Sequence, residues 1–361
     1  MCKPKQEGGL GLRSLKEAND VWCLKLIWRI ISNGDSLWVK WVRSSLLKQG
    51  SIWAVKDNTC LGSWMWKKVL KYRDIAKSLY RTEIKNGART SFWFDNWSDM
   101  GRLIDIAGDR GIIDMGIAKH ATVAEAWTNR RRRRQRVNYL NQMEEILSLK
   151  WQSQQHEEDR VLWRGKNDAF HTTFSTKDTW NHTRTTTNKV AWYKGVWFAQ
   201  AIPKHAFCMW LAVQNRLSTG DRMVQWNMGV EPTCVLCNSE LENRDHIFFS
   251  CSYAKEVWEP LAKTIYKTRY TTDWQAIIHS VSNHWPNWIE GFLARCVLQA
   301  TIHTIWRERN ERKHVNHPSP AVRLVKWIDK HIRNHISAIN LSGDRRYDGG
   351  LQIWFQTRET S

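Results

Sequence analysis

The sequence has no uninterrupted run of about eighteen apolar residues, which argues against a membrane-spanning helix. Its amino terminus lacks the apolar core of a secretory signal peptide, because Lys3, Lys5 and Glu7 interrupt it at once. A disulfide framework is also missing, since the eight cysteines show no pairing pattern, and this is typical of a reducing compartment. We therefore expect a soluble, intracellular protein.

The motifs of phosphate and polymerase chemistry are missing as well. There is no glycine-rich phosphate-binding loop, and no adjacent pair of aspartates occurs that could hold the two metal ions of a polymerase. The tail after Asp344 is too short to supply the several carboxylates that an RNase H domain needs. We predict that the chain is not an enzyme.

Three weaker enzyme-like patterns have simpler interpretations. His331 and His335 are one helical turn apart, but without the glutamate of a His-Glu-x-x-His motif they are more typical of a helix surface. Cys208 follows His205 by three residues, and a packed thiol is favoured over a nucleophile. Three aspartates in a glycine-containing segment could gather a metal but are more typical of solvated turns: Asp105, Asp109 and Asp114.

A metal-ligand pattern is present between positions 234 and 251. Cys234 and Cys237 are separated by two residues, and His246 and Cys251 follow. Three thiolates and one imidazole suit tetrahedral Zn²⁺, and four protein ligands leave no open position for catalysis. We predict one structural zinc ion held by these four residues. The alternative is a reduced, packed cysteine pair.

Positive charge is the strongest feature of the composition. The chain has 55 Lys and Arg against 35 Asp and Glu, which gives a formal net charge of +20. Such a balance favours nucleic acid as the acidic partner, bound through its phosphates. The alternatives are a merely basic soluble protein and a fragment separated from an acidic neighbouring domain.

A run of arginines follows the capping box formed by Thr122 and Glu125. Its side chains would surround every face of a helix, which favours a phosphate-binding or nuclear-localisation segment, and hence the nucleus rather than the cytoplasm. A solvated helix face is the alternative. The run comprises Arg130, Arg131, Arg132, Arg133, Arg134 and Arg136.

The 24 tryptophans have two possible uses. Exposed indoles beside Lys or Arg can stack on unpaired bases. Most of them lie in apolar periodic segments, as Trp28 does beside Ile27 and Ile31, so we expect about four in five to belong to the core.

Periodicity predicts a mainly α protein with short β-hairpins (α+β), in which helical modules surround a small Cys-Cys-His-Cys zinc knuckle. Ser14 and Ser175 begin capping boxes of two helices, and Asn86-Gly87 predicts a tight hairpin between residues 80–85 and 88–94. Two further short strands are expected at 160–163 and 169–174. The predicted segments are 1–97 (helical, ending in the hairpin), 98–121 (loop or linker), 122–189 (basic helix and small α+β segment), 190–266 (zinc-binding domain), 267–340 (helices) and 341–361 (loosely ordered tail).

Fixed spacings across the chain carry a resemblance to a family. Residues 202–258 resemble the reverse-transcriptase zinc-binding domain of plant LINE-type (non-LTR) retrotransposons. Residues 3–12 and 92–97 are similar to the segment that follows the polymerase in those elements, and residues 306–310 to their carboxyl-terminal end. The central matches are Ile202, Pro203, Lys204, His205, Phe207, Trp210, Leu211, Leu217, Ser218, Thr219, Asp221, Trp226, Cys234, Cys237, Glu242, His246, Phe248, Cys251, Val257 and Trp258.

The resemblance implies a fragment of a larger polyprotein, whose polymerase a complete element would supply as a partner. We hypothesise a non-catalytic, zinc-binding protein that binds RNA or a DNA–RNA hybrid. The competing hypothesis is a protein-interaction scaffold that zinc holds together, without a role in nucleic-acid binding. Besides the arginine run, the candidate nucleic-acid contacts lie around the knuckle: Lys204, His205, Arg216, Arg222, Trp226 and Arg244.

Overall fold

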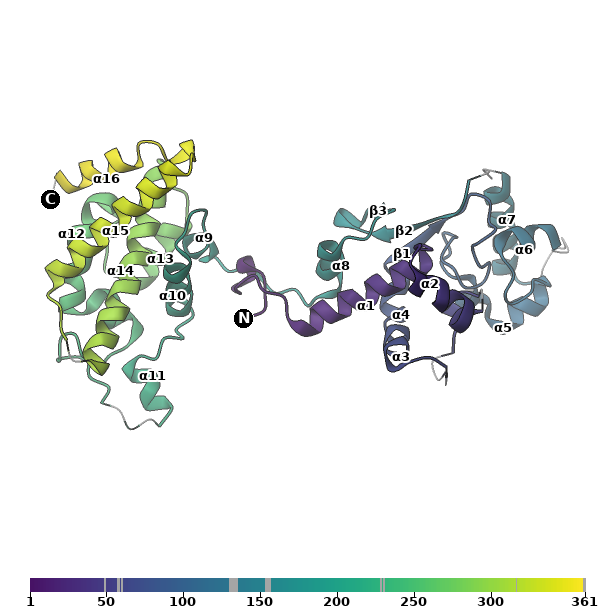
Figure 1. The fold of residues 1–361 in the computed structure, drawn as a ribbon, viewed down its shortest axis with the longest axis horizontal. Helices are drawn as coiled ribbons and strands as arrows, with labels where there is room; N and C mark the ends of the chain where they lie inside the picture. Colours follow the sequence, from purple (N-terminus) through teal and green to yellow (C-terminus); the bar gives the residue numbers. More distant parts are fainter. Residues whose placement is uncertain are drawn as a thin grey trace. The chain divides into compact units, whose positions relative to one another are not determined.

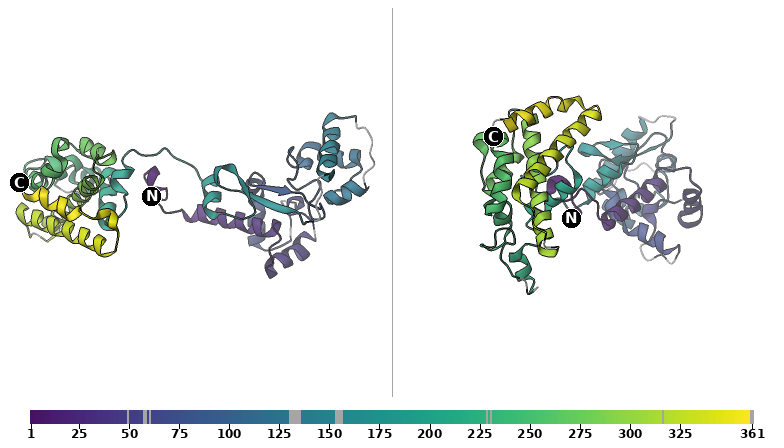
Figure 2. Two further views of the ribbon diagram at one scale, coloured as in Figure 1. Left: turned by 90° about the horizontal axis from the view of Figure 1, so that it is seen from above. Right: turned by 60° about the vertical axis from the view of Figure 1, so that its left-hand side comes forward.

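The computed structural model describes residues 1–361 apart from 49, 57–58, 60, 130–135, 153–156, 228, 230, 316 and 360–361. The chain divides into two compact units (Figure 1). Unit 1 contains residues 1–12 and 187–361, and unit 2 contains residues 13–186. Figure 2 shows both units from two further directions. Among the described residues, no helix is both long enough and apolar enough to cross a membrane.

Unit 2 combines helices with one small antiparallel sheet. Its sheet has the order β1-β2-β3, with Trp163 of β2 opposite Tyr80 of β1 and His171 of β3. Helix α1 packs against α3, α4 and α8. The elements are α1 (Leu15–Ile31), α2 (Leu37–Trp41), α3 (Trp64–Lys71), α4 (Arg73–Lys77), β1 (Tyr80–Glu83), α5 (Leu103–Met115), α6 (Val123–Asn129), α7 (Asn138–Gln152), β2 (Arg160–Arg164), β3 (Phe170–His171) and α8 (Thr176–Thr183).

Local capping signals are confirmed at the starts of three helices. The Ser14 hydroxyl accepts a hydrogen bond from the Glu17 N–H at 3.1 Å before α1, and Ser175 caps α8 in the same way. At α6 the box is complete, because the Glu125 carboxylate also accepts the Thr122 N–H at 2.9 Å. These bonds satisfy backbone donors that the first helical turn leaves unpaired.

The predicted hairpin around Asn86-Gly87 is wrong. Strand β1 pairs with β2, more than seventy residues later in the chain, and residues 88–94 form no strand. Phe92, Trp93 and Phe94 are all buried, whereas a strand would send alternate side chains to opposite faces. The tight segment is held instead by Asp159, whose carboxylate accepts the Gly87 N–H at 2.9 Å.

Unit 1 is a helical domain built around the 27-residue helix α14. Helix α14 contacts α10, α12, α15 and α16, and its buried face runs through most of its length. The helices are α9 (Tyr193–Val196), α10 (Pro203–Val213), α11 (Gly220–Gln225), α12 (Ser252–Tyr266), α13 (Trp274–Ser282), α14 (Trp288–His314), α15 (Ala321–Leu341) and α16 (Gly350–Glu359). A π-helical turn, His246–Ser250, precedes α12.

Two segments expected to lack regular structure are helical. Residues 98–121 contain α5, and the tail after 341 contains α16. Trp354 on α16 is fully buried and donates its indole N–H to Asp329 at 2.9 Å. Twelve of the 24 tryptophans are buried, six more are partly buried and pack against the two cores, and five are exposed, which is close to the expected four in five.

A candidate metal centre and its supports

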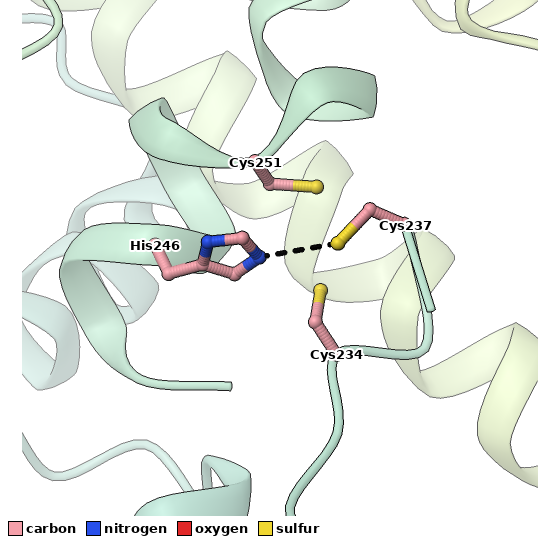
Figure 3. Close-up of side chains that lie close together, drawn as sticks. All are labelled: Cys234, Cys237, His246 and Cys251. Atoms are coloured by element: carbon pink, nitrogen blue, oxygen red, sulfur yellow. Dashed lines mark hydrogen bonds between the residues drawn. The ribbon is translucent and has the colours of Figure 1, made fainter. Parts of the chain in front are cut away.

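The four predicted ligands meet in unit 1 (Figure 3). Their ligand atoms, three Sγ and one imidazole nitrogen, all lie within 4.8 Å of one another. The Nε2 atom of His246 is 3.3 Å from the Sγ of Cys237. Cys234 and Cys251 are fully buried, His246 is 4% exposed, and Cys237 is half-buried. Among the described residues, no other group of three or more Cys, His, Asp or Glu side chains is placed to hold a metal.

Local backbone structure positions these side chains. Cys234 and Cys237 lie in a tight loop closed by the Cys234 N–H bonding to Glu240 O at 2.8 Å and by an isolated bridge between Thr233 and Leu241. Asn238 adopts a left-handed conformation, with φ of 54°, which turns the chain back after the second cysteine. Cys251 is the residue immediately before α12.

The thiol pKa values move in different directions because the sulfurs contact one another. A hydrogen bond to Cys251 and burial raise the pKa of Cys234, while the same bond lowers the pKa of Cys251. Burial raises the pKa of Cys237, but the hydrogen bonds that its sulfur accepts, including one from the Ser239 hydroxyl at 3.3 Å, outweigh burial and lower it overall. The hydrogen bonds within the cluster thus ease deprotonation of Cys237 and Cys251 and oppose that of Cys234.

The donor set fits Zn²⁺. Tetrahedral Zn–S bonds of about 2.3 Å place sulfur atoms about 3.8 Å apart, which is compatible with four atoms inside 4.8 Å. The Nε2 atom of His246 faces the sulfurs, and its Nδ1 atom lies 3.0 Å from a Glu240 carboxylate oxygen, although not in line for a hydrogen bond. Such a carboxylate commonly orients a metal-bound imidazole.

Helix α14 follows the knuckle in the sequence and holds it in place through side-chain hydrogen bonds. Arg312 donates to the carbonyl of Leu236, inside the Cys234–Cys237 loop, at 3.1 Å. The same guanidinium bonds to the buried Glu308 carboxylate at 2.8 Å and lies 4.2 Å over the Tyr253 ring. Arg312 therefore fixes the loop that carries two of the ligands.

A buried ion pair makes a second connection between α14 and the knuckle. Arg309 and Glu242 are each 2% exposed, and the guanidinium bonds to both carboxylate oxygens at 2.6 to 3.1 Å. Glu242 also accepts the Gly220 N–H at 2.8 Å, and Arg309 donates to Ser218 O at 3.0 Å. Nothing local in the sequence indicates that Glu242 and Arg309, 67 positions apart, form a pair.

The predicted nucleic-acid contacts around α10 and its following loop differ in exposure. Lys204 and Arg216 are exposed, and Arg216 lies 5.7 Å over the Trp210 ring. His205 is 1% exposed and therefore does not present its side chain to a ligand on the surface. Lys204 and Arg216 remain candidates.

The other candidates are partly engaged within the protein. Arg222 lies 5.0 Å over Trp226, which is 48% exposed, so this pair presents an indole and a positive charge together. Arg244 is paired with Asp245 at 2.6 Å and packs 4.6 Å from the Trp274 ring, which leaves it little freedom. The run of Arg130, Arg131, Arg132, Arg133 and Arg134 lies outside the described residues.

Four histidines gather where α10, α14 and α15 meet. The ring of His205 lies 4.5 Å from that of His303 and 5.0 Å from that of His331, and His335 contacts Gln200 O at 2.7 Å. Burial lowers the pKa of His205 to about 3 and that of His303 to about 4, and the positive charges around them add to the effect. The charged and titratable groups facing this cluster are Lys204, Arg307, His331 and His335. His331 and His335 are half-buried, so the prediction that both lie on a helix surface is only partly correct.

The remaining enzyme-like patterns do not form a site. Cys208 is buried, and burial raises its pKa to about 12, which disfavours a thiolate nucleophile. The three aspartates predicted to lie in turns belong to α5, where each has a basic partner: Asp105 with Arg102, Asp109 with Lys119 and Asp114 with Arg110.

Comparison with known proteins gives matches of two kinds. Residues 174–258 match the model of a family described as zinc-binding in reverse transcriptase. A putative ribonuclease H protein of Arabidopsis thaliana is 22% identical over 271 residues, which cover 72% of this chain and 42% of that protein. An uncharacterized mitochondrial protein of the same plant is 31% identical over 99 residues, covering 27% of this chain and 63% of that protein.

The chain thus spans less than two thirds of the length of these two relatives. No solved structure matches it significantly. The matched family region contains the whole Cys-Cys-His-Cys cluster, and the longer alignment extends the similarity over most of the chain. The chain therefore contains, at residues 174–258, a region of the zinc-binding type found in reverse transcriptases, and these matches support a retrotransposon origin.

Proposed function

We propose that Cys234, Cys237, His246 and Cys251 hold one structural Zn²⁺ ion and that the protein binds nucleic acid without catalysing a reaction. The observation that carries the proposal is the closed set of three sulfurs and one imidazole nitrogen within 4.8 Å. When bound, zinc would hold the loop and the start of α12 together. Four protein ligands complete a tetrahedron, so no position is left to activate water or substrate.

Nucleic-acid binding is supported by charge and by the surface near the knuckle. The net charge of +20 favours a polyanionic partner. Arg216, Arg222 and Trp226 present two guanidinium groups and an indole from the segment just before the first cysteine. Small zinc domains bind single strands by combining such stacking with phosphate contacts, which favours RNA, and the phosphate contacts alone would also serve a DNA–RNA hybrid.

Metal content tests the first part of the proposal. The purified protein should contain about one zinc per chain, and Cys251→Ser should lower that content strongly because it removes a fully buried ligand. Cys2→Ser is the matched control, since Cys2 is an exposed free thiol outside the cluster. Zinc content that is unchanged in Cys251→Ser would remove this residue from the site.

Titration with labelled single-stranded RNA and with a DNA–RNA hybrid at several salt concentrations tests the second part. The affinity should fall steeply with salt, since binding releases counterions. Trp226→Ala should weaken RNA binding, whereas Trp22→Ala, which removes a comparably exposed indole beside Lys25, should not. Absence of binding at low salt would leave the protein-interaction scaffold as the function.

A further inference from the structure

A column of planar and cationic groups lies on the surface formed by α14 and α15. The Trp327 ring is stacked on the His331 ring with centroids 4.9 Å apart and an interplanar angle of 7°. The guanidinium of Arg307 lies 4.6 Å over the same Trp327 ring. Arg307 is exposed, and Trp327 is half-buried. We call His303, Trp306, Arg307, Trp327 and His331 the α14–α15 face, and Lys204 at the start of α10 adds positive charge beside it.

The face borders an open hollow of about 410 Å³ on α14. Every residue that lines the hollow belongs to α14 or directly follows it, so the hollow is a shallow, open depression and not an enclosed cleft. An indole, a guanidinium, an imidazole and an amide converge on it. The hollow is lined by His303, Trp306, Arg307, Asn310, Glu311 and Val315.

The hollow lies on the side of α14 that the knuckle does not use. Because an α-helix has 3.6 residues per turn, Glu308, Arg309 and Arg312 project toward one side and Arg307 toward the other. Trp306 lies between the two sides, and the Arg309 guanidinium is 4.8 Å from one face of its ring. The first side is fixed by buried hydrogen bonds to Glu242 and Leu236. Helix α14 is thus a rigid support for the groups that it exposes.

The charge of the face is predominantly positive. Lys204 and Arg307 act on His303 strongly enough to lower its pKa, after burial itself. The acidic group lining the hollow is Glu311, whose carboxylate lies 3.4 Å from Arg307. A polyanion with flat, hydrogen-bonding bases matches this combination better than an apolar ligand does.

We propose that the α14–α15 face is a second contact for single-stranded nucleic acid, in which the hollow takes one unpaired base. The base stacks against Trp306 or the Arg307 guanidinium, and Lys204 and Arg307 attract the neighbouring phosphates. This inference rests on the proposed nucleic-acid binding and adds a contact on α14 to the one beside the knuckle. A duplex, whose bases are already stacked on each other, would use only the positive charge.

The test uses the zinc-loaded full chain, a labelled ten-nucleotide single-stranded RNA and an RNA duplex of equal length. Trp306→Leu should weaken single-strand binding about 5- to 150-fold and leave duplex binding within twofold. Arg307→Gln should weaken both and reduce the slope of log affinity against log salt by about one. Arg345→Gln removes one exposed charge elsewhere in unit 1 and serves as the matched control.

The outcomes separate this inference from the proposed function. Wild-type protein that binds no RNA at low salt overturns both proposals. Binding that is weakened by Trp226→Ala but not by Trp306→Leu or Arg307→Gln overturns the α14–α15 face alone. Equal losses of single-strand and duplex binding in Trp306→Leu overturn the base-stacking role. Zinc content and melting temperature verify the fold of each variant, and Arg307→Gln, at an exposed position, keeps the test valid if Trp306→Leu does not fold.

Discussion

Replacing Arg309 with methionine should destabilise unit 1 more than any surface change. The substitution keeps an unbranched side chain of similar length but removes the positive charge that faces Glu242, and both residues are 2% exposed. The carboxylate loses three hydrogen-bond contacts with the guanidinium and keeps the Gly220 N–H. Breaking a buried ion pair on one side costs about 3–5 kcal/mol, because an uncompensated charge remains. For a unit of this size the melting temperature should fall by about 6–20 °C.

Thermal unfolding followed by calorimetry measures this effect. Arg346→Met is the matched control, because Arg346 pairs with Asp344 at 2.7 Å but its side chain is 70% exposed, so its replacement should leave the melting temperature nearly unchanged. The double variant Arg309→Leu with Glu242→Leu should recover much of the stability, since no unpaired charge is left. If Arg309→Met melts within about 2 °C of the control, the pair does not stabilise the fold as argued.

Three further predictions concern both units. Burial lowers the folded-state pKa of His205 to about 3 and that of His303 to about 4, so below pH 6.5 the unfolded chain binds more protons than the folded chain. The contribution of each histidine to the free energy of unfolding should therefore be complete above pH 6.5 and should fall by about 2 kcal/mol by pH 5. Equal urea midpoints at pH 7.5 and pH 5 would contradict this prediction. Trp354→Ala should cost about 3–5 kcal/mol in thermal unfolding, since the side chain is fully buried, whereas Trp22→Ala should cost less than about 1 kcal/mol; similar values for the two would refute the packing of α16. Asp159→Ala should destabilise unit 2 by about 1–3 kcal/mol, because the N–H groups of Lys85 and Gly87 and the Thr90 hydroxyl lose their acceptor. An unchanged unfolding midpoint would show that the segment from Lys85 to Thr90 does not need this carboxylate.

Features that depend on neighbouring residues could be predicted from the sequence. The caps at Ser14, Thr122 and Ser175 need only a residue three positions later, and all three form. The four metal-ligand residues lie within eighteen positions, so their spacing alone indicated the cluster that the structure brings together. Short range is what these correct predictions share.

Features that depend on burial against distant residues could not be predicted in the same way. Asn86-Gly87 has the local signature of a hairpin, but the burial of Phe92 and Trp93 in the core directs the following chain away from β1. Helix α16 has little intrinsic signal and is held by Trp354 against α15. Tertiary packing decided these elements, as it commonly does for short segments.

The site shows the same limit. Arg309 and Arg312 lie in a charged stretch that is typical of a solvated helix surface. In the structure both guanidinium groups point into the molecule and fix the ligand-bearing loop. Conversely, His205 has a residue type suited to phosphate contacts, yet it is enclosed by two other histidines.

The contact between Arg312 and Leu236 O has a consequence for the length of the piece that can work alone. The family match ends at residue 258, whereas the guanidinium that fixes the loop comes from residue 312. A peptide trimmed to the matched region would retain the three cysteines and the histidine but lose the hydrogen bond from Arg312 that fixes the loop before the ion binds. Such a peptide would have to order its own loop each time it captured an ion, and it would release the ion sooner.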